Sequence, residues 1–434
     1  MRKLFKGGIH PSACKGLTDR CAIEVMPSPA IVAIPISQHI GKPAKVVVEV
    51  GQEVKMGQLI AQCDGAISAN IFSSVSGKVK EIKVLPTPTG ACEHIVIEND
   101  GNDEEVRLQP IESPDSDSVV DRLVSAGIIG MGGAGFPAGV KFRPTSPVDT
   151  LVVNAAECEP YVNCDNRIMI EYASEFIDGV KLLMTAGKVN KAYIAVEDNK
   201  PLAIKTLNDY LTENEIDDIV VSVLKTKYPQ GSEKHIIYSA TGRVVPLGSL
   251  PASVGVIVTN THTALSTHYA VREGIPLYKR IMTVTGEGIT TPKNVWVSGG
   301  TSYNQVIDFC GGTKEGKRVV KMISGGPMMG FAVAGGVYAC GKTTSCIILM
   351  TDGEAFTGAP SACINCGRCA KACPMNLMPM YMDAYSRVGD WDGAVKYGLN
   401  ACIECGCCTY VCPAKRTLVQ SFRLAKRELR GRKK

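Results

Sequence analysis

The sequence lacks three features that would place a protein in a broad class at once. Its 434 residues carry a net charge of only +5, which is too small to argue for nucleic-acid binding. No apolar run approaches the length of a membrane span, and Cys346–Met350 is among the longest. The first residues, Met1–Gly8, contain no apolar stretch of the kind that a secretory signal requires. We therefore expect a protein that stays in the cytoplasm and does not itself cross the membrane.

Cysteine and glycine, in contrast, are abundant. The 18 cysteines of a chain without an export signal are expected to be thiols or metal ligands rather than disulfides. The 44 glycines fit strand-rich domains and cofactor loops. A chain of this length with 45% hydrophobic residues should form about three or four domains, each with its own core.

Two matched cysteine runs lie near the C-terminus. They span Cys363–Cys373 and Cys402–Cys412, and each is followed by a proline. Both obey the spacing C-x2-C-x2-C-x3-C-P, which is typical of proteins with two [4Fe–4S] clusters, where the fourth cysteine of each run binds the other cluster. The spacing therefore predicts two ligand sets: Cys363, Cys366, Cys369 and Cys412 for one cluster, and Cys402, Cys405, Cys408 and Cys373 for the other.

A zinc site is a weaker interpretation of these cysteines. Zinc sites favour two CxxC pairs or mixed Cys/His sets, not matched triplets that each end in Cys-Pro. Cys407 falls outside the spacing, although it could exchange roles with Cys408.

The segment between the runs has helical patterns at 377–385 and 391–399, so we expect an α-helical two-cluster ferredoxin module that carries single electrons.

The N-terminal part has short strands separated by turns. Val46–Val50, Gly51–Ile60 and Ile71–Val79 resemble a biotinyl/lipoyl-type barrel-sandwich domain. Carrier domains of that type bear a lysine at the hairpin between the two halves. The corresponding segment here, Asp64–Asn70, contains no lysine. We therefore expect a structural or docking role for this domain and not a swinging arm.

A glycine loop follows a helix that we expect over 115–125. The loop, Gly130–Pro137, matches G-x-G-x-x-G, but a Rossmann fingerprint follows a strand and opens a helix, and this loop does neither. From the residues alone, it is either a loop whose amides approach a phosphate or a flat ring, or a tight turn.

An alternation of strands and helices comes next and predicts an α/β unit with a parallel sheet. Strands are expected at 150–154, 192–196, 218–225 and 256–260, with helices at 169–186 and 200–208. The first strand runs into the polar segment Ala155–Arg167, and the last strand also has a polar exit. Open α/β sheets bind ligands at such strand exits.

The glycine loop through Lys141, the strand exit Asn154–Pro160 and the order of the surrounding segments resemble the C subunits of Rnf electron-transport complexes. This resemblance covers essentially the whole chain, including Lys6–Pro11. The flavin domain is also similar to the NADH- and FMN-binding subunit of respiratory complex I, which ends in a single cluster. The resemblance implies a multidomain fold: a lipoyl-like barrel-sandwich domain at 1–112, an FMN/NAD-binding α/β domain at 113–268, a β-grasp (SLBB) domain at 269–352, a two-cluster ferredoxin-like domain at 353–418 and a basic tail at 419–434.

The resemblance also implies which residues contact FMN or NAD(H). They are Gly132, Gly133, Gly135, Phe136 and Lys141 around the glycine loop, Asn154, Glu157 and Glu159 at the first strand exit, Tyr228, Gly231 and Glu233 in a second loop, and Asn260 and Thr263 at the last exit. Two positions depart from complex I, because Ala156 replaces an aspartate and Ser232 a glutamate. We expect no acid–base catalytic residue, because hydride transfer needs only that nicotinamide and flavin are positioned.

The implied function is that of a peripheral subunit on the cytoplasmic face of the cell membrane. It would pass electrons between NAD(H), FMN, two [4Fe–4S] clusters and partner subunits, coupled to ferredoxin and to Na⁺ or H⁺ translocation. One alternative is a soluble flavin/iron–sulfur reductase of the cobalamin-reductase type, and another is an electron-transfer adaptor without a working flavin site. The basic tail either touches anionic lipid or an acidic partner, or is a solvated, frayed end.

Overall fold

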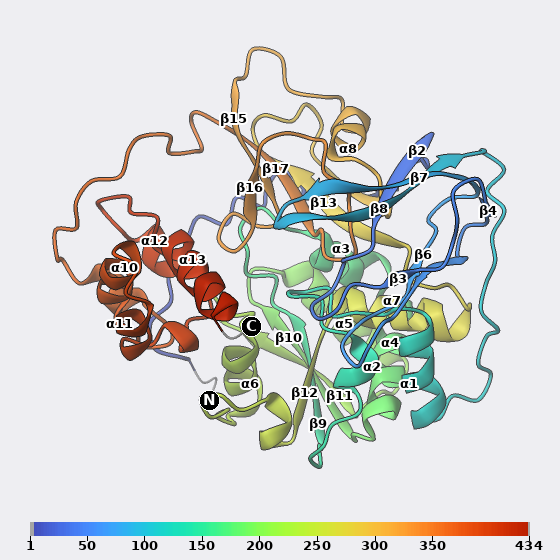
Figure 1. Cartoon of the computed structure of the whole chain (residues 1–434). Helices are drawn as coiled ribbons and strands as arrows, with labels where there is room; N and C mark the ends of the chain where they lie inside the picture. Colours follow the sequence, from blue (N-terminus) through green and yellow to red (C-terminus); the bar gives the residue numbers. More distant parts are fainter. Residues whose placement is uncertain (1–3, 433–434) are drawn as a thin grey trace.

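The computed structural model describes residues 4–432 and contains two β-rich units, a parallel α/β unit and a small helical module (Figure 1). The first β-rich unit, blue and cyan in Figure 1, is called the barrel unit below. It consists of a four-stranded sheet in the order β2-β8-β7-β4 and a three-stranded sheet in the order β3-β5-β6. Its strands are β2 (Ile31–Pro35), β3 (Lys45–Val46), β4 (Glu53–Val54), β5 (Leu59–Gln62), β6 (Ile71–Phe72), β7 (Gly77–Thr87) and β8 (Gly90–Asn99). Apolar side chains such as Val32, Ile60 and Ile95 fill the space between the sheets.

The α/β unit is a parallel sheet in the order β11-β10-β9-β12 with helices on both faces. Its elements are α1 (Ser116–Ser125), α2 (Ala138–Lys141), β9 (Thr150–Ala155), α3 (Cys164–Glu171), α4 (Ala173–Gly187), β10 (Lys191–Glu197), α5 (Pro201–Glu213), β11 (Ile219–Leu224), α6 (Glu233–Thr241), the 3₁₀ turn η1 (Pro251–Val254), β12 (Val256–Asn260) and α7 (Thr261–Arg272). The inner strands β9 and β10 and the strand β12 are buried on both faces, which is why they are nearly all apolar, whereas the edge strand β11 is only partly buried.

The starts and ends of these helices mostly follow local signals. Asp115 caps α1, because its side chain accepts a hydrogen bond from the Ser118 amide, as part of a complete capping box. The helix expected at 169–186 is wrong in one respect: it begins earlier, at Cys164, and is broken at Tyr172 into α3 and α4. The break lets α4 pack along α7.

The second β-rich unit, which we call the β-grasp unit, is a six-stranded sheet in the order β1-β14-β13-β17-β15-β16. Its elements are β1 (Ile23–Val25), β13 (Lys279–Thr285), β14 (Lys293–Ser298), α8 (Tyr303–Phe309), β15 (Val319–Ser324), β16 (Phe331–Val333) and β17 (Cys346–Thr351). The first strand, β1, pairs in parallel with β14. On the way to this sheet the preceding segment passes the other units, where Gly8 and Ile9 hydrogen-bond to Ala372 and Tyr228.

The helical module, red in Figure 1, lies beside the α/β unit. It contains α9 (Arg368–Ala372), α10 (Pro379–Arg387), α11 (Trp391–Lys396), the 3₁₀ turn η2 (Leu399–Ala401), α12 (Cys407–Tyr410) and α13 (Leu418–Gly431). Helix α13 corresponds to the expected basic tail, of which residues 433–434 lie outside the described part. The segment is not a frayed end, because α13 buries Leu418, Val419, Phe422 and Ala425 in the core of the module. Across residues 4–432, no helix has the length and apolarity needed to span a bilayer.

Candidate functional site

The parallel sheet has its topological switch between β9 and β12. From β9 the chain continues to β10 and β11 on one side, and then returns to place β12 on the other side. Asn154 and Asn260 stand directly opposite each other at the carboxyl ends of these two strands. In open α/β sheets, ligands bind in the crevice at this point.

Both asparagine side chains are fixed by hydrogen bonds. Asn154 donates from Nδ2 to the Gly231 carbonyl over 2.7 Å, which brings the second predicted loop to the crevice. Asn260 donates to the carboxylate of Asp165 over 2.8 Å, and its Oδ1 accepts from the His262 amide at the start of α7 over 3.0 Å. The two side chains therefore connect β9 to the loop that contains Gly231, and β12 to the starts of α3 and α7.

The glycine loop lies directly over this crevice. A Cβ atom added to Gly132 would stand 2.9 Å from Nδ2 of Asn260, so only glycine allows this approach. Thr263 holds the base of the loop, since its hydroxyl accepts from the Met131 amide over 3.1 Å and donates to the Ile129 carbonyl over 3.0 Å. A Cβ on Gly133 would meet no protein atom within 4 Å, so this part of the loop is open to a ligand.

The far end of the loop rests on the barrel unit. Gly135 has φ +70° and packs against Gln38, His39 and Thr343, and its carbonyl accepts from the Ile40 amide over 3.4 Å. Half-buried Phe136 follows and closes the loop, because its carbonyl accepts from the Gly130 amide over 2.8 Å. The loop is therefore held at both ends and forms a wall of the crevice.

Lys141 and Glu233 form an ion pair next to this wall. The Lys141 ammonium donates to Oε1 of Glu233 over 3.2 Å and to the Val258 carbonyl of β12 over 3.1 Å. Glu233 is the first residue of α6. The structure thus brings these two predicted residues together.

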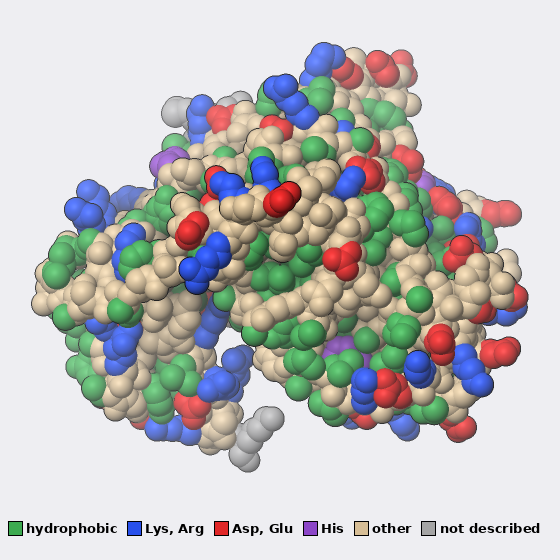
Figure 2. Space-filling model, turned by 90° about the horizontal axis from the view of Figure 1, so that it is seen from above, with side chains coloured by type: hydrophobic (Ala, Val, Ile, Leu, Met, Phe, Trp, Pro, Cys, Tyr) green, Lys and Arg blue, Asp and Glu red, His purple; other side chains and the backbone are tan. Residues whose placement is uncertain are grey.

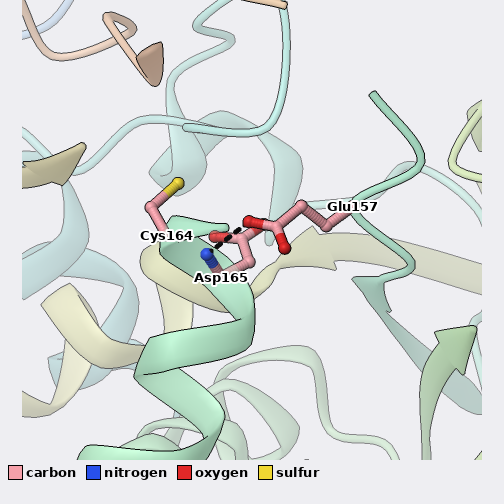
Figure 3. A group of neighbouring side chains, drawn as sticks. All are labelled: Glu157, Cys164 and Asp165. Atoms are coloured by element: carbon pink, nitrogen blue, oxygen red, sulfur yellow. Dashed lines mark hydrogen bonds between the residues drawn. The ribbon is translucent and has the colours of Figure 1, made fainter. Parts of the chain in front are cut away.

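Glu157 and Asp165 lie side by side at the start of α3 (Figure 3). The Glu157 carboxylate accepts from the backbone amides of Asp165 and Asn166 over 2.6 and 3.3 Å, and therefore caps the helix. Burial, together with the nearby charge of Glu157, raises the pKa of Asp165 to about 7. Cys164 completes the group, with its sulfur within 4.8 Å of both carboxylates.

Sequence reasoning missed a buried charged group beside the crevice. Glu197, the last residue of β10, and Lys200 are almost fully buried. Burial raises the pKa of Glu197 to about 7 and lowers that of Lys200 to about 8. Lys200 donates to the carbonyl of Ala156 over 2.7 Å, so the position that lacks the aspartate of complex I is held through its backbone. The position of Glu197, directly after a predicted strand, was the available signal.

Glu159 and Tyr228 are also close together, but their polar atoms point to a different region. The Tyr228 hydroxyl lies 3.3 Å from Oε1 of Glu159 and donates to the carbonyl of Cys405 over 2.8 Å. Burial of the Glu159 carboxylate raises its pKa to about 7. These two residues therefore lie where the α/β unit meets the helical module.

The cysteines of the module gather in the two predicted sets. Cys363, Cys366, Cys369 and Cys412 line one cavity of about 170 Å³, so the last cysteine of the second run does lie with the first three of the first run. In the other set, burial raises the pKa of Cys408, and the neighbouring thiolates of Cys405, Cys402 and Cys373 raise it further. Four thiols around one space suit the donor requirement of a [4Fe–4S] cluster in both cases.

The two sets differ in exposure. Cys363 and Cys366 are exposed, whereas Cys373, Cys405 and Cys408 are buried. We call the first set the outer set and the second the inner set. Cys407 is buried in an apolar cluster with Ile9, Tyr228 and Cys405, so it lies against the inner set at the boundary with the α/β unit.

A glycine-walled crevice at the switch of a parallel sheet, joined to a module with two four-cysteine sets, defines an electron-transfer flavoprotein of the iron–sulfur type. Models of four domain families match the chain: the Nuo51 FMN-binding domain at 123–268, the RnfC barrel sandwich hybrid domain at 3–102, the SLBB domain at 281–332 and the 4Fe-4S dicluster domain at 362–417. These matches confirm the predicted multidomain fold and the expected cofactor types, FMN and [4Fe–4S].

Curated relatives match over almost the entire chain. The C subunit of the proton-translocating ferredoxin:NAD(+) oxidoreductase complex of Clostridium ljungdahlii is 46% identical over 99% of this chain and 95% of its own length. The C subunit of the Na(+)-translocating complex of Acetobacterium woodii is 42% identical over 98% and 97%. The C subunit of the ion-translocating oxidoreductase complex of Rhodobacter capsulatus is 42% identical over 98% and 83%. The chain belongs to this family, the C subunits of Rnf-type complexes, as its motifs predicted.

A solved structure agrees at the level of the fold. A chain of the NAD+-reducing [NiFe]-hydrogenase in its H2-reduced state aligns with a TM-score of 0.51 at 15% identity. The alignment covers 74% of this chain and 65% of the hydrogenase chain. At that identity the match concerns the fold alone.

Proposed function

We propose that the chain is the peripheral NAD(H)-oxidising and NAD(H)-reducing subunit of a membrane-bound Rnf electron-transport complex. It binds NAD(H), FMN and two [4Fe–4S] clusters, and it exchanges electrons with the other subunits of the complex, of which some are ferredoxin-type and some lie in the membrane. In the complex this transfer is coupled to ferredoxin and to the translocation of Na⁺ or H⁺. The chain lies on the cytoplasmic face of the membrane, where its partners attach it.

The residues around the β9–β12 switch support the cofactor assignment. Asn154, Asn260 and Thr263 offer polar groups at the strand ends, and the open face at Gly132 and Gly133 leaves room for a flat ring or a phosphate. We propose that Gly135, Phe136, Lys141, Glu157, Gly231 and Glu233 complete the wall for FMN and the dinucleotide. When bound, the flavin exchanges a hydride with nicotinamide and single electrons with iron–sulfur clusters. The protein's task is to bind and orient the reactants, which lowers the entropic cost of the encounter.

The two cysteine sets support an order of transfer on which the sequence was silent. The inner set adjoins the α/β unit, because the Tyr228 hydroxyl contacts the Cys405 carbonyl at 2.8 Å, and this single contact carries the proposal. The outer set faces solvent through Cys363 and Cys366. We therefore assign the inner set to exchange with the flavin crevice and the outer set to exchange with a partner protein of the complex.

The domain limits follow the same scheme. We propose boundaries near residues 112, 268 and 352, with α13 counted with the cysteine module. Residues 4–25 serve as a strap that runs past the module and the α/β unit into the β-grasp sheet, since Gly8 and Ile9 hydrogen-bond to Ala372 and Tyr228 on the way.

The test is a stopped-flow experiment on anaerobic protein reconstituted with iron, sulfide and FMN. Mixing with NADH should bleach the flavin band first and then reduce the cluster absorbance. If FMN binds but NADH reduces nothing, the donor is another molecule and the NAD(H) assignment fails. If FMN does not bind although both clusters are intact, the chain is an adaptor. Purification without membranes or membrane partners would favour the soluble reductase.

A further inference from the structure

The side chain of Glu159 makes its hydrogen bonds where the α/β unit, the β-grasp unit and the helical module meet. Its carboxylate accepts from the backbone amides of Met328 and Met329 over 3.0 and 2.9 Å. These methionines lie in the loop between β15 and β16 of the β-grasp sheet. The third partner is the hydroxyl of Tyr228 at 3.3 Å. Glu159 therefore connects the exit of β9 to the β-grasp unit, and its oxygens are already used.

Tyr228 extends this connection to the helical module. It is only 2% exposed, and its hydroxyl donates to the carbonyl of Cys405 over 2.8 Å. Its backbone forms a two-way pair with Ile9 of the N-terminal strap, over 2.9 and 2.8 Å. A buried tyrosine that has one proton and two acceptors within reach is fully committed to this junction.

The module makes its other contacts on the same side, around the inner cysteine set. The Gly8 amide donates to Ala372 over 2.9 Å, a ring nitrogen of His235 lies 3.2 Å from the Pro374 carbonyl, and Arg423 donates to the Met329 carbonyl over 2.8 Å. Figure 2 shows the module as a lobe at the left, separated from the rest by a notch along the lower edge of the view. The contacts on this side therefore fix the distance between the inner set and the crevice.

We propose that Glu159 and Tyr228 are positioning residues that hold the inner cysteine set against the flavin crevice, and not residues that contact nicotinamide. The inference rests on the proposed function, which it deepens by giving these two side chains a role in transfer between cofactors. Removal of the Tyr228 hydroxyl leaves the Cys405 carbonyl and the Glu159 carboxylate short of a buried donor, so the module should sit less firmly.

The test compares Tyr228→Phe, Glu159→Gln and the matched control Tyr278→Phe. Tyr278 is also a buried tyrosine that donates to a glutamate, Glu105, over 2.7 Å, but at the barrel junction. The holoproteins are mixed with NADH under stopped flow. In the first two variants, flavin bleaching should keep its wild-type rate while cluster reduction slows about tenfold, which corresponds to about 1.4 kcal/mol. The control should keep both rates.

A second measurement does not depend on turnover. Hydrogen exchange of the oxidised holoproteins should show faster exchange in residues 4–9 and 405–410 of Tyr228→Phe and Glu159→Gln only. The inference is overturned if flavin bleaching slows in these variants, because that result assigns them to the nicotinamide. It is also overturned if both rates and the exchange remain those of the wild type. Failure of the proposed function would look different, since NADH would then bleach no flavin in the wild-type protein.

Discussion

At the scale of single residues, substitutions at two neighbouring glycines distinguish a packing defect from a loss of ligand binding. In Gly132→Ala the new Cβ would press against Asn260, and overpacking of this kind costs about 1–3 kcal/mol. In Gly133→Ala it would meet no protein atom, so only a bound cofactor could feel it. We expect Gly132→Ala to lower the melting temperature and Gly133→Ala to leave it unchanged while weakening FMN or NADH binding. Thermal melts and fluorescence titrations measure both quantities. Unchanged affinity in Gly133→Ala would place the ligand elsewhere.

Asp165 should give the stability a defined pH dependence. Its pKa is raised to about 7 in the folded protein from a usual value of 3.8, so the folded state holds a proton that the unfolded state releases. The resulting destabilisation grows from about pH 4 to pH 7 and is complete above that. Asp165→Asn cannot ionise, and we expect it to be more stable than wild type at pH 8 by roughly 2–4 kcal/mol.

The measurement for Asp165 is a pair of denaturation curves for each protein, at pH 5 and pH 8. The other buried acids, Glu159 and Glu197, titrate alike in both proteins, so their contributions cancel in the difference between variant and wild type. We expect the advantage of Asp165→Asn to shrink at pH 5. An advantage of equal size at both pH values would show that Asp165 is ionised in the folded state throughout this range.

At the scale of elements, α13 supplies four of the buried core residues of the cysteine module, Leu418, Val419, Phe422 and Ala425. Phe422 is fully buried in the module core, whereas Leu424 on the opposite face is 43% exposed. Replacing a buried phenylalanine with alanine costs about 3–5 kcal/mol. We expect Phe422→Ala to lose iron while keeping FMN, and Leu424→Ala to keep both, as measured by iron assay and flavin absorbance. Wild-type iron content in Phe422→Ala would mean that the module folds without α13.

The elements also show how far the sequence could be interpreted. Apolar strands and capping residues predicted β9, β10, β12 and α1 to within a few residues, because those signals are local. The break at Tyr172 was missed, since it serves the packing of α4 on α7. The charge-rich pattern of α13 concealed its apolar face of Leu418, Val419, Phe422 and Ala425. The basic composition therefore left a solvated end among the two interpretations of this segment, and the buried face of α13 excludes that one.

The candidate site, too, could be predicted from the sequence only in part. The cysteine spacing predicted two crossed ligand sets, and the structure gathers the thiols accordingly. The glycine loop was undecided from the residues alone and was assigned to the cofactors only by the resemblance; the structure places Asn260 and Thr263 under it. Nothing local in the sequence could show that Glu159 and Tyr228 meet Met328, Met329 and Cys405, because these contacts join segments more than a hundred residues apart. Glu197 and Lys200 were missed because burial, and not their type, makes them unusual.

At the scale of the whole molecule, the assembly protects one cysteine set and leaves the other open. The inner set lies on the side of the module that faces the N-terminal strap and the α/β unit, with Cys373, Cys405 and Cys408 buried. The outer set has Cys363 and Cys366 at the surface. Oxygen and chelators reach exposed thiolates first, since oxidation follows access to the sulfur.

We therefore expect brief exposure of the reconstituted protein to air to remove about half of its iron in a first phase, from the outer set, and the remainder much more slowly. Alkylation of the thiols released in the first phase, followed by peptide mapping, should label Cys363, Cys366, Cys369 and Cys412. Tyr228→Phe should shorten the second phase and leave the first unchanged, because it loosens the junction that covers only the inner set. Loss of all iron in one phase would contradict this view, because the two sets would then be equally accessible and the junction would shield neither.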